Sequence, residues 1–508
     1  MGGEIAGGLG ASSAPLDVAL RSGWTTGLAG SEAGGSHCRQ SSTASTGGRE
    51  GGAFAPNRDR HRAPRFKCRH RLARAMPVGP LRGFRDYPPP EAGIRSTLFG
   101  RMRAAARRAG YQELETPSVE NLDLYREKSG EELVQQVWRF VDRGDREVAL
   151  TPETTPSLAR VYAERAKAEP LPVKWFTVSK LWRYEEPQAG RTREFSQFNL
   201  DLLGVPGVEA EADLLHAASL VLDAAGAQGR YVFRVNDRPL TEAIARAFGA
   251  RDRDRYFRIV DQFRKLSRSA VETGLQDAGI DNGPRRGELL RLLDATARAP
   301  AGTEVGPLLD RLAGLDLDAE GRQGIERLRR LAELAGWLGF SDRLAIDLTV
   351  VRGLAYYSST VFEAFDPEQS GRALFGGGRY DHLIERYGGP PTPAVGLAIG
   401  DQTLELLLRA AGRWGDGEPL LDTYVVAVTS EMVPEAFRLT AELRAAGRSA
   451  DLDLLGRSLS RQLKEAARRA RTATLVGPRE LARGVVVVRD LTSGEQQERP
   501  RSSWGPSG

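Results

Sequence analysis

A hairpin predicted over residues 173–204 collects side chains that could bind a charged, partly aromatic ligand. Two apolar-rich strands flank a polar, basic loop over 186–192 that contains Pro187 and Gly190. An arginine can clamp a phosphate with two hydrogen bonds, a carboxylate can hold magnesium, and a phenylalanine can stack on a purine. The alternative is an ordinary exposed hairpin with surface ion pairs. Because side chains alternate between the two faces of a strand, one face is expected to carry Arg183, Glu185, Phe195, Gln197, Asn199 and Asp201.

A second stretch, over 345–408, alternates strand-like segments with glycines. β-Branched and aromatic residues dominate its first part, and Gly376, Gly377 and Gly378 would let the backbone approach a bound ligand closely. The chain contains neither a Walker A motif nor G-x-G-x-x-G, which excludes the P-loop and Rossmann nucleotide sites.

Together these motifs resemble those of the histidyl-tRNA synthetases, a family of class II aminoacyl-tRNA synthetases. RYEEPQAGRTREFSQFNLDLLG is similar to motif 2, and R-G-L-x-Y-Y, G-G-G-R-Y-D and A-V-G-x-A-x-G are similar to the histidine motifs and motif 3. A predicted helix and strand before Pro117 resemble motif 1, which builds the dimer interface in that family. The resemblance covers about residues 80–495. It implies an α+β fold, with the antiparallel-sheet catalytic core of class II, a helical insertion and a C-terminal α/β anticodon-binding domain.

The resemblance also implies a role for each matching residue. Arg352 would be the catalytic cation that stabilises charge on the α-phosphate while the amino-acid carboxylate attacks it. Arg183 would contact the same phosphate, and Glu185 would hold ATP or its magnesium ion. Arg191 would bind the outer phosphates and Phe195 would stack on adenine. The histidine-binding residues implied are Glu153, Thr154, Thr155, Gln197, Asp201, Tyr356 and Tyr357.

Two groups of contacts are expected within the histidine site. Tyr357 and Asp201 would contact the two imidazole nitrogens, one as donor and one as acceptor. The turn over 151–156, which carries Glu153 and Thr155, could instead only cap a helix. Thr155 would then be the cap and Pro156 the first helical residue. The residues expected around the α-amino group are Glu153, Thr155 and Gln197.

Two departures from most bacterial members concern ATP binding. Ala355 stands where those members carry aspartate, and Gln402 and Thr403 follow Asp401 where their motif 3 ends in Glu-Arg. Losing a charge-assisted phosphate contact costs on the order of 1.5–3 kcal/mol. A branch of the family that includes plant organellar forms is similar at both places.

Charge and cysteine content exclude several kinds of site. The net charge of +5 arises in residues 1–75, which hold eleven Lys or Arg and five Asp or Glu. The remainder holds 61 basic and 62 acidic residues, so any RNA contact must come from a local patch. Both cysteines, Cys38 and Cys68, lie in the leading segment, which excludes cysteine zinc sites, thiol nucleophiles and disulfides in the body. The sequence contains no run of 18 or more apolar residues, the length needed to span a membrane.

Composition and periodicity divide the chain into parts. Residues 1–75 are rich in Gly, Ser and Arg, which predicts a disordered leader. It would arise from an upstream start codon, with translation beginning at Met76, or be an organellar transit peptide. The other parts are expected as catalytic core over 76–236 and 344–410, a helical insertion over 237–343, and the anticodon-binding domain over 420–500.

The second helix of the C-terminal domain is predicted to be basic. It is a candidate RNA-facing surface, and a solvated helix is the alternative. Its basic residues, with those flanking it, are Arg457, Arg461, Lys464, Arg468, Arg469 and Arg471.

The resemblance implies a cytoplasmic, homodimeric histidine–tRNA ligase. Such an enzyme activates L-histidine with ATP and Mg²⁺ to an adenylate and transfers the acyl group to the 3′ end of tRNA(His). It uses no prosthetic group and no membrane partner. One rival is the non-catalytic histidyl-tRNA-synthetase-like regulatory subunit of ATP phosphoribosyltransferase, which has lost catalytic residues and lacks the anticodon domain. A second rival is an RNA-binding protein on the same scaffold, which would bind tRNA without forming an adenylate.

Overall fold

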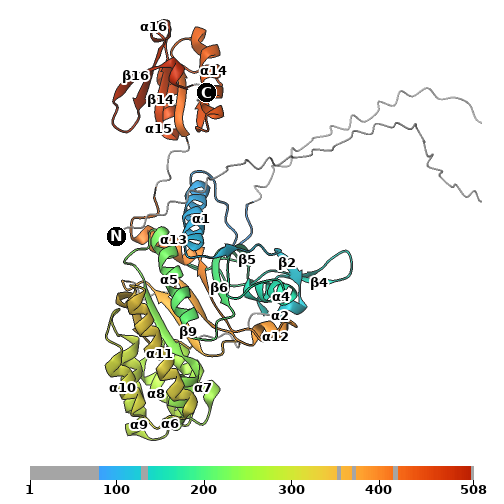
Figure 1. Ribbon diagram of the computed structural model, residues 1–508, viewed down its shortest axis with the longest axis vertical. Coiled ribbons are helices and arrows are strands. Elements are labelled where there is room, and N and C mark those ends of the chain that lie inside the picture. The colour runs from blue at the N-terminus through green and yellow to red at the C-terminus, as the bar shows by residue number, and fades with distance from the viewer. Residues whose placement is uncertain (1–78, 127–134, 352–355, 369–372, 416–420, 505–508) are drawn as a thin grey trace, which may run out of the picture. The chain divides into compact units, whose positions relative to one another are not determined.

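The computed structural model describes residues 79–504 apart from four short gaps, at 127–134, 352–355, 369–372 and 416–420. Arg352 and Ala355 fall in one of these gaps, so both lie outside the described residues. The body over 79–415 and the C-terminal domain over 421–504 are described separately (Figure 1). None of the described helices is both long and apolar enough to cross a membrane.

The body is built around an eight-stranded sheet in the order β1-β5-β6-β11-β10-β9-β7-β8. The two outer pairs, β1/β5 and β7/β8, are parallel, and all the inner pairs are antiparallel. This arrangement confirms the predicted α+β class with an antiparallel-rich core. The strands are β1 (Gln112–Glu113), β5 (Val173–Trp182), β6 (Glu194–Leu203), β7 (Val232–Asp237), β8 (Leu344–Ile346), β9 (Thr360–Phe365), β10 (Phe375–Arg379) and β11 (Ala394–Gly400).

The predicted hairpin is formed by β5 and β6, which pair from Val173–Leu203 to Trp182–Glu194. One face of β6 carries Phe198, Leu200 and Leu202, which belong to the main apolar core. Helices α1 (Glu91–Arg108) and α5 (Glu209–Ala224) contribute to the same core and cover this face (Figure 1). The other face is therefore left for the polar residues that could do chemistry.

A smaller unit supports the turn over 151–154. Its three-stranded sheet has the order β2-β4-β3, and one apolar cluster joins Ala149 of β4 to Leu124 and Tyr125 of α2. Helix α4 (Thr155–Arg165) begins at Thr155, and its N-cap residue Thr154 makes no side-chain cap hydrogen bond. The interpretation of Thr155 as a cap is wrong, because Thr155 already has helical geometry. The other elements are β2 (Val119–Asn121), β3 (Arg139–Val141), β4 (Glu147–Leu150), α2 (Asp123–Arg126) and α12 (Leu383–Arg386).

Six helices connect β7 to β8, in the part of the chain where periodicity predicts a helical insertion. Five of them start at a residue whose side chain accepts a hydrogen bond from the first turn, which satisfies a backbone N–H that the helix leaves free. These caps are Asp237, Asp252, Ser267, Asn282 and Asp318. The helices are α6 (Arg238–Ala247), α7 (Arg253–Asp261), α8 (Arg268–Asp277), α9 (Gly283–Ala297), α10 (Gly306–Ala313) and α11 (Ala319–Trp337).

The C-terminal domain is a mixed five-stranded sheet in the order β13-β12-β14-β15-β16, as the alternation of apolar strands and helices predicts. The buried Gln462 holds helix α15 to β12 by accepting from Ala427 N and donating to Ala427 O, each at 3.2 Å. The elements are β12 (Leu421–Ala427), α14 (Val433–Ala445), β13 (Ala450–Leu452), α15 (Leu459–Arg469), β14 (Ala470–Val476), α16 (Pro478–Ala482), β15 (Val485–Asp490) and β16 (Gln496–Pro500).

Candidate active site

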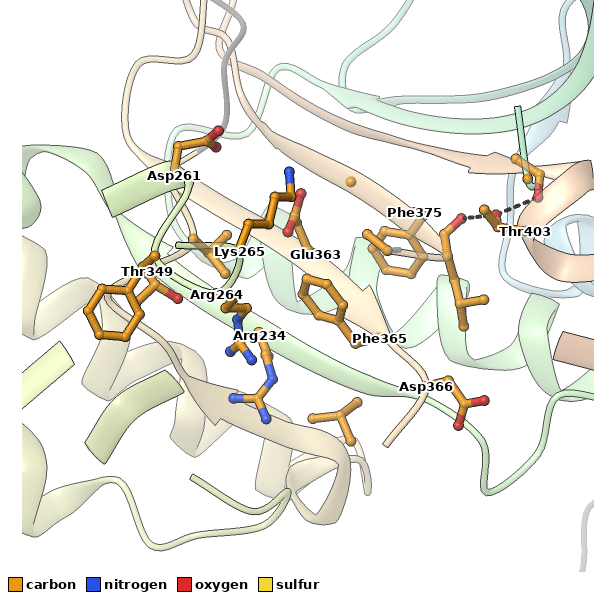
Figure 2. A pocket seen from close by; sticks show the side chains of 18 of the residues that line it. Arg234, Asp261, Arg264, Lys265, Thr349, Glu363, Phe365, Asp366, Phe375 and Thr403 are labelled. Carbon is orange, nitrogen blue, oxygen red and sulfur yellow. Dashed lines mark hydrogen bonds between the residues drawn. The ribbon is translucent and has the colours of Figure 1, made fainter. Parts of the chain in front are cut away.

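A cavity of about 1280 Å³ lies over one end of β6, β11, β10, β9 and β7. These strands are antiparallel neighbours, so the start of β6 and the end of β11 meet at the same edge of the sheet. Helix α13 (Asp401–Ala410) begins at this edge, and the loop between α7 and α8 lines the opposite wall (Figure 2). The cavity is large enough for a nucleotide.

The hairpin contributes a cluster of charged and aromatic residues to the cavity. Glu185 lies 3.2 Å from Nη1 of Arg191 and 4.0 Å from Nη1 of Arg183. The Arg183 guanidinium lies 5.4 Å from the centre of the Phe195 ring. The five predicted site residues that the structure brings together here are Arg183, Glu185, Arg191, Phe195 and Gln197.

The turn that precedes α4 is joined to this cluster by Arg183, whose Nε donates to Pro152 O at 2.9 Å. Glu153 and Thr154 are buried and Thr155 is half-buried. None of these three residues is among those that line the cavity. Of the predicted α-amino ligands, Gln197 therefore lines the cavity, whereas Glu153 and Thr155 do not.

Asp201 forms a second centre, fully buried on the same face of β6 as Gln197. The two positions are four residues apart, which corresponds to about 13 Å along the strand. Tyr380 donates its hydroxyl hydrogen to Asp201 Oδ1 at 2.5 Å, while Oδ2 has no hydrogen-bond partner among the described residues. Burial raises the pKa of Asp201 to about 7, although the bond from Tyr380 works in the opposite direction.

Two glycines make room for this centre. A Cβ atom on Gly396, which is opposite Asp201 on β11, would overlap the carboxylate of Asp201. A Cβ atom on Gly378 would lie 2.8 Å from the ring of Tyr357. Side chains at these two strand positions would therefore displace the groups that form the pocket.

Tyr356 and Tyr357 pack around the same carboxylate–tyrosine pair. Their ring centres are 5.0 Å apart, and the Tyr356 ring is 6.0 Å from that of Tyr380. All three tyrosines belong to one apolar cluster, which also contains Val350. Val350 lines the large cavity as well, so it forms a wall shared by the cavity and the tyrosine cluster.

Sequence reasoning assigned no role to Tyr380 or to Gly396. Both lie in motifs noted above, since Tyr380 follows G-G-G-R and Gly396 belongs to A-V-G-x-A-x-G. The pairing of Tyr380 with Asp201 joins residues 179 positions apart, so spacing alone could not identify it.

The end of motif 3 departs from the usual pattern, and the structure shows what replaces it. Asp401 is buried and accepts from Arg95 Nη2 at 2.5 Å. Gln402 donates to the hydroxyl of Tyr87 at 3.1 Å, and the Arg95 guanidinium lies 4.0 Å from the centre of the Tyr87 ring. Thr403 donates to Gly400 O, so it makes an ordinary helix-start contact and supplies no cation to the cavity.

Glu185 was the predicted magnesium ligand. No group of three or more His, Cys, Asp or Glu residues that could hold a metal ion occurs among the described residues. A Mg²⁺ ion in a nucleotide site is usually held by one or two carboxylates together with the phosphates. The carboxylate of Glu185 faces the cavity between two arginines. It fits a Mg²⁺ ion held jointly by one carboxylate and the phosphates, and does not fit an ion held only by protein side chains.

The predicted basic helix of the C-terminal domain is partly neutralised. Arg469 pairs with Asp451 at 2.8 Å, and Arg457 and Arg468 lie 3.6 and 3.5 Å from Glu465. Arg461 and Lys464, on exposed positions of α15, form no ion pair with other described residues. These two residues carry most of the free positive charge of the helix.

Comparison with known proteins finds matches for both the body and the C-terminal domain. The family described as Histidyl-tRNA synthetase matches residues 83–404, and that described as Anticodon binding domain matches 422–504. Histidine–tRNA ligase of Halobacterium salinarum is 39% identical over 428 residues, which are 84% of this chain and 96% of that protein. The enzyme of Thermoplasma volcanium is 37% identical over 423 residues, 83% of this chain and 96% of that one.

Solved structures show the same fold at lower identity. The histidyl-tRNA synthetase of Nostoc sp. PCC 7120 superimposes with a TM-score of 0.72 at 23% identity, covering 84% of this chain and 98% of that one. A Bacillus halodurans protein described as an ATP phosphoribosyltransferase regulatory subunit/histidyl-tRNA synthetase gives 0.64 at 21% identity, covering 77% and 97%. The family match over the catalytic part, the match of the C-terminal domain and the identity to these ligases agree: this chain belongs to the histidyl-tRNA synthetase family.

Proposed function

We propose that this chain is a histidine–tRNA ligase that forms histidyl-adenylate and transfers histidine to the 3′ end of tRNA(His). The observation that carries the proposal is the geometry of the two neighbouring sites. A nucleotide-sized cavity is lined by cations, a carboxylate and an aromatic ring. It shares the wall residue Val350 with the tyrosine cluster beside the buried Asp201.

The cavity suits ATP. Adenine stacks on Phe195, Arg183 contacts the α-phosphate, and Arg191 binds the outer phosphates. Glu185 would hold the magnesium ion that accompanies the nucleotide, and that ion would supply positive charge to the phosphates. Arg352, which lies outside the described residues, is assigned to the α-phosphate, where charge develops as the histidine carboxylate attacks.

The buried centre suits the imidazole of histidine. Oδ1 of Asp201 is occupied by the hydroxyl of Tyr380, so Oδ2 is left to accept an imidazole N–H. Tyr357 contacts the other ring nitrogen. A site built from buried polar groups rejects apolar look-alikes strongly, because those would leave Oδ2 without a partner. The α-amino group is assigned to Glu153, Thr155 and Gln197, and Thr154 is assigned to the histidine site without a specified contact.

Further features are proposed on the family pattern. The C-terminal domain binds the anticodon arm, with Arg461 and Lys464 as candidate phosphate contacts. The enzyme is a homodimer assembled through the region of α1, and it works in the cytoplasm with Mg²⁺ as the ion. The rival regulatory subunit lacks an anticodon-binding domain, whereas residues 422–504 of this chain match one.

The test is pyrophosphate–ATP exchange with each amino acid in turn, followed by charging of purified tRNA. We expect exchange and charging with histidine alone. The regulatory-subunit alternative predicts neither reaction, and the RNA-binding alternative predicts tRNA binding without exchange. Exchange with another amino acid and not with histidine would contradict the assignment of the Asp201 centre.

A further inference from the structure

Asp347 is a completely buried carboxylate on the segment that follows β8. Its Oδ2 accepts from Arg264 Nη2 and, at 3.3 Å, from Arg234 Nη1. Its Oδ1 accepts from the backbone N–H and the hydroxyl of Thr349, at 3.0 and 2.6 Å. Both carboxylate oxygens therefore have strong donors, as a buried charge requires.

The two arginines come from different parts of the molecule. Arg234 is on the core strand β7 and is largely buried, whereas Arg264 is on the loop between α7 and α8 and its side chain is 39% exposed. Figure 2 shows their guanidinium groups beside one another among the residues that line the cavity. Among the described residues, Arg264 is the cation through which the insertion reaches Asp347.

Both arginines also bind the carboxyl end of helix α9 in the insertion. Arg234 donates to Thr296 O and Ala299 O at 3.4 and 3.2 Å, and Arg264 donates to Ala297 O at 2.7 Å. The last carbonyls of a helix have no partner within the helix and carry partial negative charge, so cations are favoured there. The carboxylate of Asp347 and the end of α9 are thus held together by shared guanidinium groups.

The segment after Asp347 forms a wall of the proposed active site. Thr349, Val350 and Val351 line the cavity. Asn236 fixes the segment by donating to Leu348 O and Val350 O at 3.3 and 3.0 Å. Because Val350 also packs in the tyrosine cluster, a shift of this segment would move the wall between the cavity and the histidine pocket.

We propose that Arg264 is a positioning residue for histidine activation, which acts through Asp347 to hold the segment over 347–351 in place. This inference rests on the proposed function. Arg264 itself is assigned no contact with substrate. Its loss leaves Asp347 Oδ2 with a single donor at 3.3 Å and removes the bond from the α7–α8 loop to Ala297 O. The insertion thereby contributes to amino-acid activation before any tRNA binds.

The test is Arg264→Ala in the full chain, measured by histidine-dependent pyrophosphate–ATP exchange without tRNA. We expect kcat to fall about tenfold or more, because a charge-assisted contact is lost, while KM for histidine and for ATP changes less than about threefold. The matched control is Arg255→Ala, which removes an exposed ion pair with Asp277 inside the insertion. Its kcat is expected to equal that of the parent.

A rescue experiment separates positioning from folding. Added guanidinium ion, at concentrations far below those that unfold the protein, is expected to restore part of the kcat of Arg264→Ala and to leave the control unchanged. Arg264→Lys, which keeps the charge but not the fork of donors, is expected to have intermediate activity. The thermal midpoint of Arg264→Ala is measured alongside.

The outcomes are distinct. An unchanged kcat in Arg264→Ala, with an active parent, overturns the inference and leaves the proposed function standing. A fall in kcat that follows a loss of folded protein and is not rescued also overturns it, because the role is then structural. An inactive parent contradicts the proposed function itself.

Discussion

The proposed ATP cavity and the proposed histidine pocket differ in how their charged groups are held on one sheet. In the cavity the charges are partly exposed and already paired, as in the contacts of Glu185 with Arg183 and Arg191. In the pocket, Asp201 is buried, one of its oxygens is bound to Tyr380, and glycines leave the space it needs. A triphosphate carries enough charge to compete with surface pairs, whereas one imidazole requires donors and acceptors already fixed in a dry site.

The largest expected effect comes from filling the space in the pocket. Gly396→Ala places a methyl group on the carboxylate of Asp201, so binding of histidine should fall by at least about 100-fold while ATP binding changes little. Calorimetric titration with each ligand checks this. Gly336→Ala, at a position of helix α11 with nothing within 4 Å, is the control for the substitution itself. Normal histidine affinity in Gly396→Ala would show that imidazole does not bind at Asp201.

The next largest effect is expected from Arg183, one of the cations that line the cavity. Arg183→Ala removes the proposed α-phosphate contact and the bond to Pro152 O, so kcat of pyrophosphate exchange should fall about 100-fold. The affinity for histidine should fall much less, since Asp201 is not in contact with Arg183. Single-turnover adenylate formation measures the first quantity and equilibrium dialysis with histidine the second. Equal losses in both would mean that the two sites are not separable as described.

A smaller effect is expected from one hydroxyl group. Tyr380→Phe removes the donor to Asp201 Oδ1, so histidine should bind about tenfold more weakly, with KM for ATP unchanged. Tyr256→Phe, at another fully buried tyrosine, serves as the matched control. An unaltered KM for histidine in Tyr380→Phe would indicate that Asp201 holds its position without this bond.

The smallest effect is on stability and depends on pH. The pKa of Asp201 is raised to about 7 in the folded protein, above its value in the unfolded chain. The unfolded state therefore ionises first, and this residue's contribution to the free energy of unfolding is greatest at about pH 4 and declines until about pH 7. The difference in unfolding free energy between the parent and Asp201→Asn, from urea titrations at pH 4 to 8, should fall over that window. A flat difference would mean that Asp201 is not desolvated.

The hairpin shows how much of a site local pattern can predict. Strand alternation predicted that Phe195 and Gln197 share one face, and both line the cavity from β6. It was also applied to Arg183 and Glu185, but β5 ends at Trp182, so these two residues reach the cavity from the loop that follows the strand. The same reasoning assigned Asp201 to this face but not to a separate buried centre. Its isolation comes from packing by Tyr356, Tyr357 and Tyr380, which arrive from other strands and loops.

Sequence by itself determined the class of fold, the family, the insertion and the hairpin chemistry, since these depend on periodicity, caps and contiguous motifs. Only the tertiary structure decided that Tyr380 binds Asp201 and that Arg264 reaches Asp347 from 83 residues away. Such pairings are set by how the sheet edge, the tyrosine cluster and the end of α9 pack together. A buried carboxylate accepts hydrogen bonds from the donors that this packing brings close to it, and the spacing of residues along the sequence does not identify those donors.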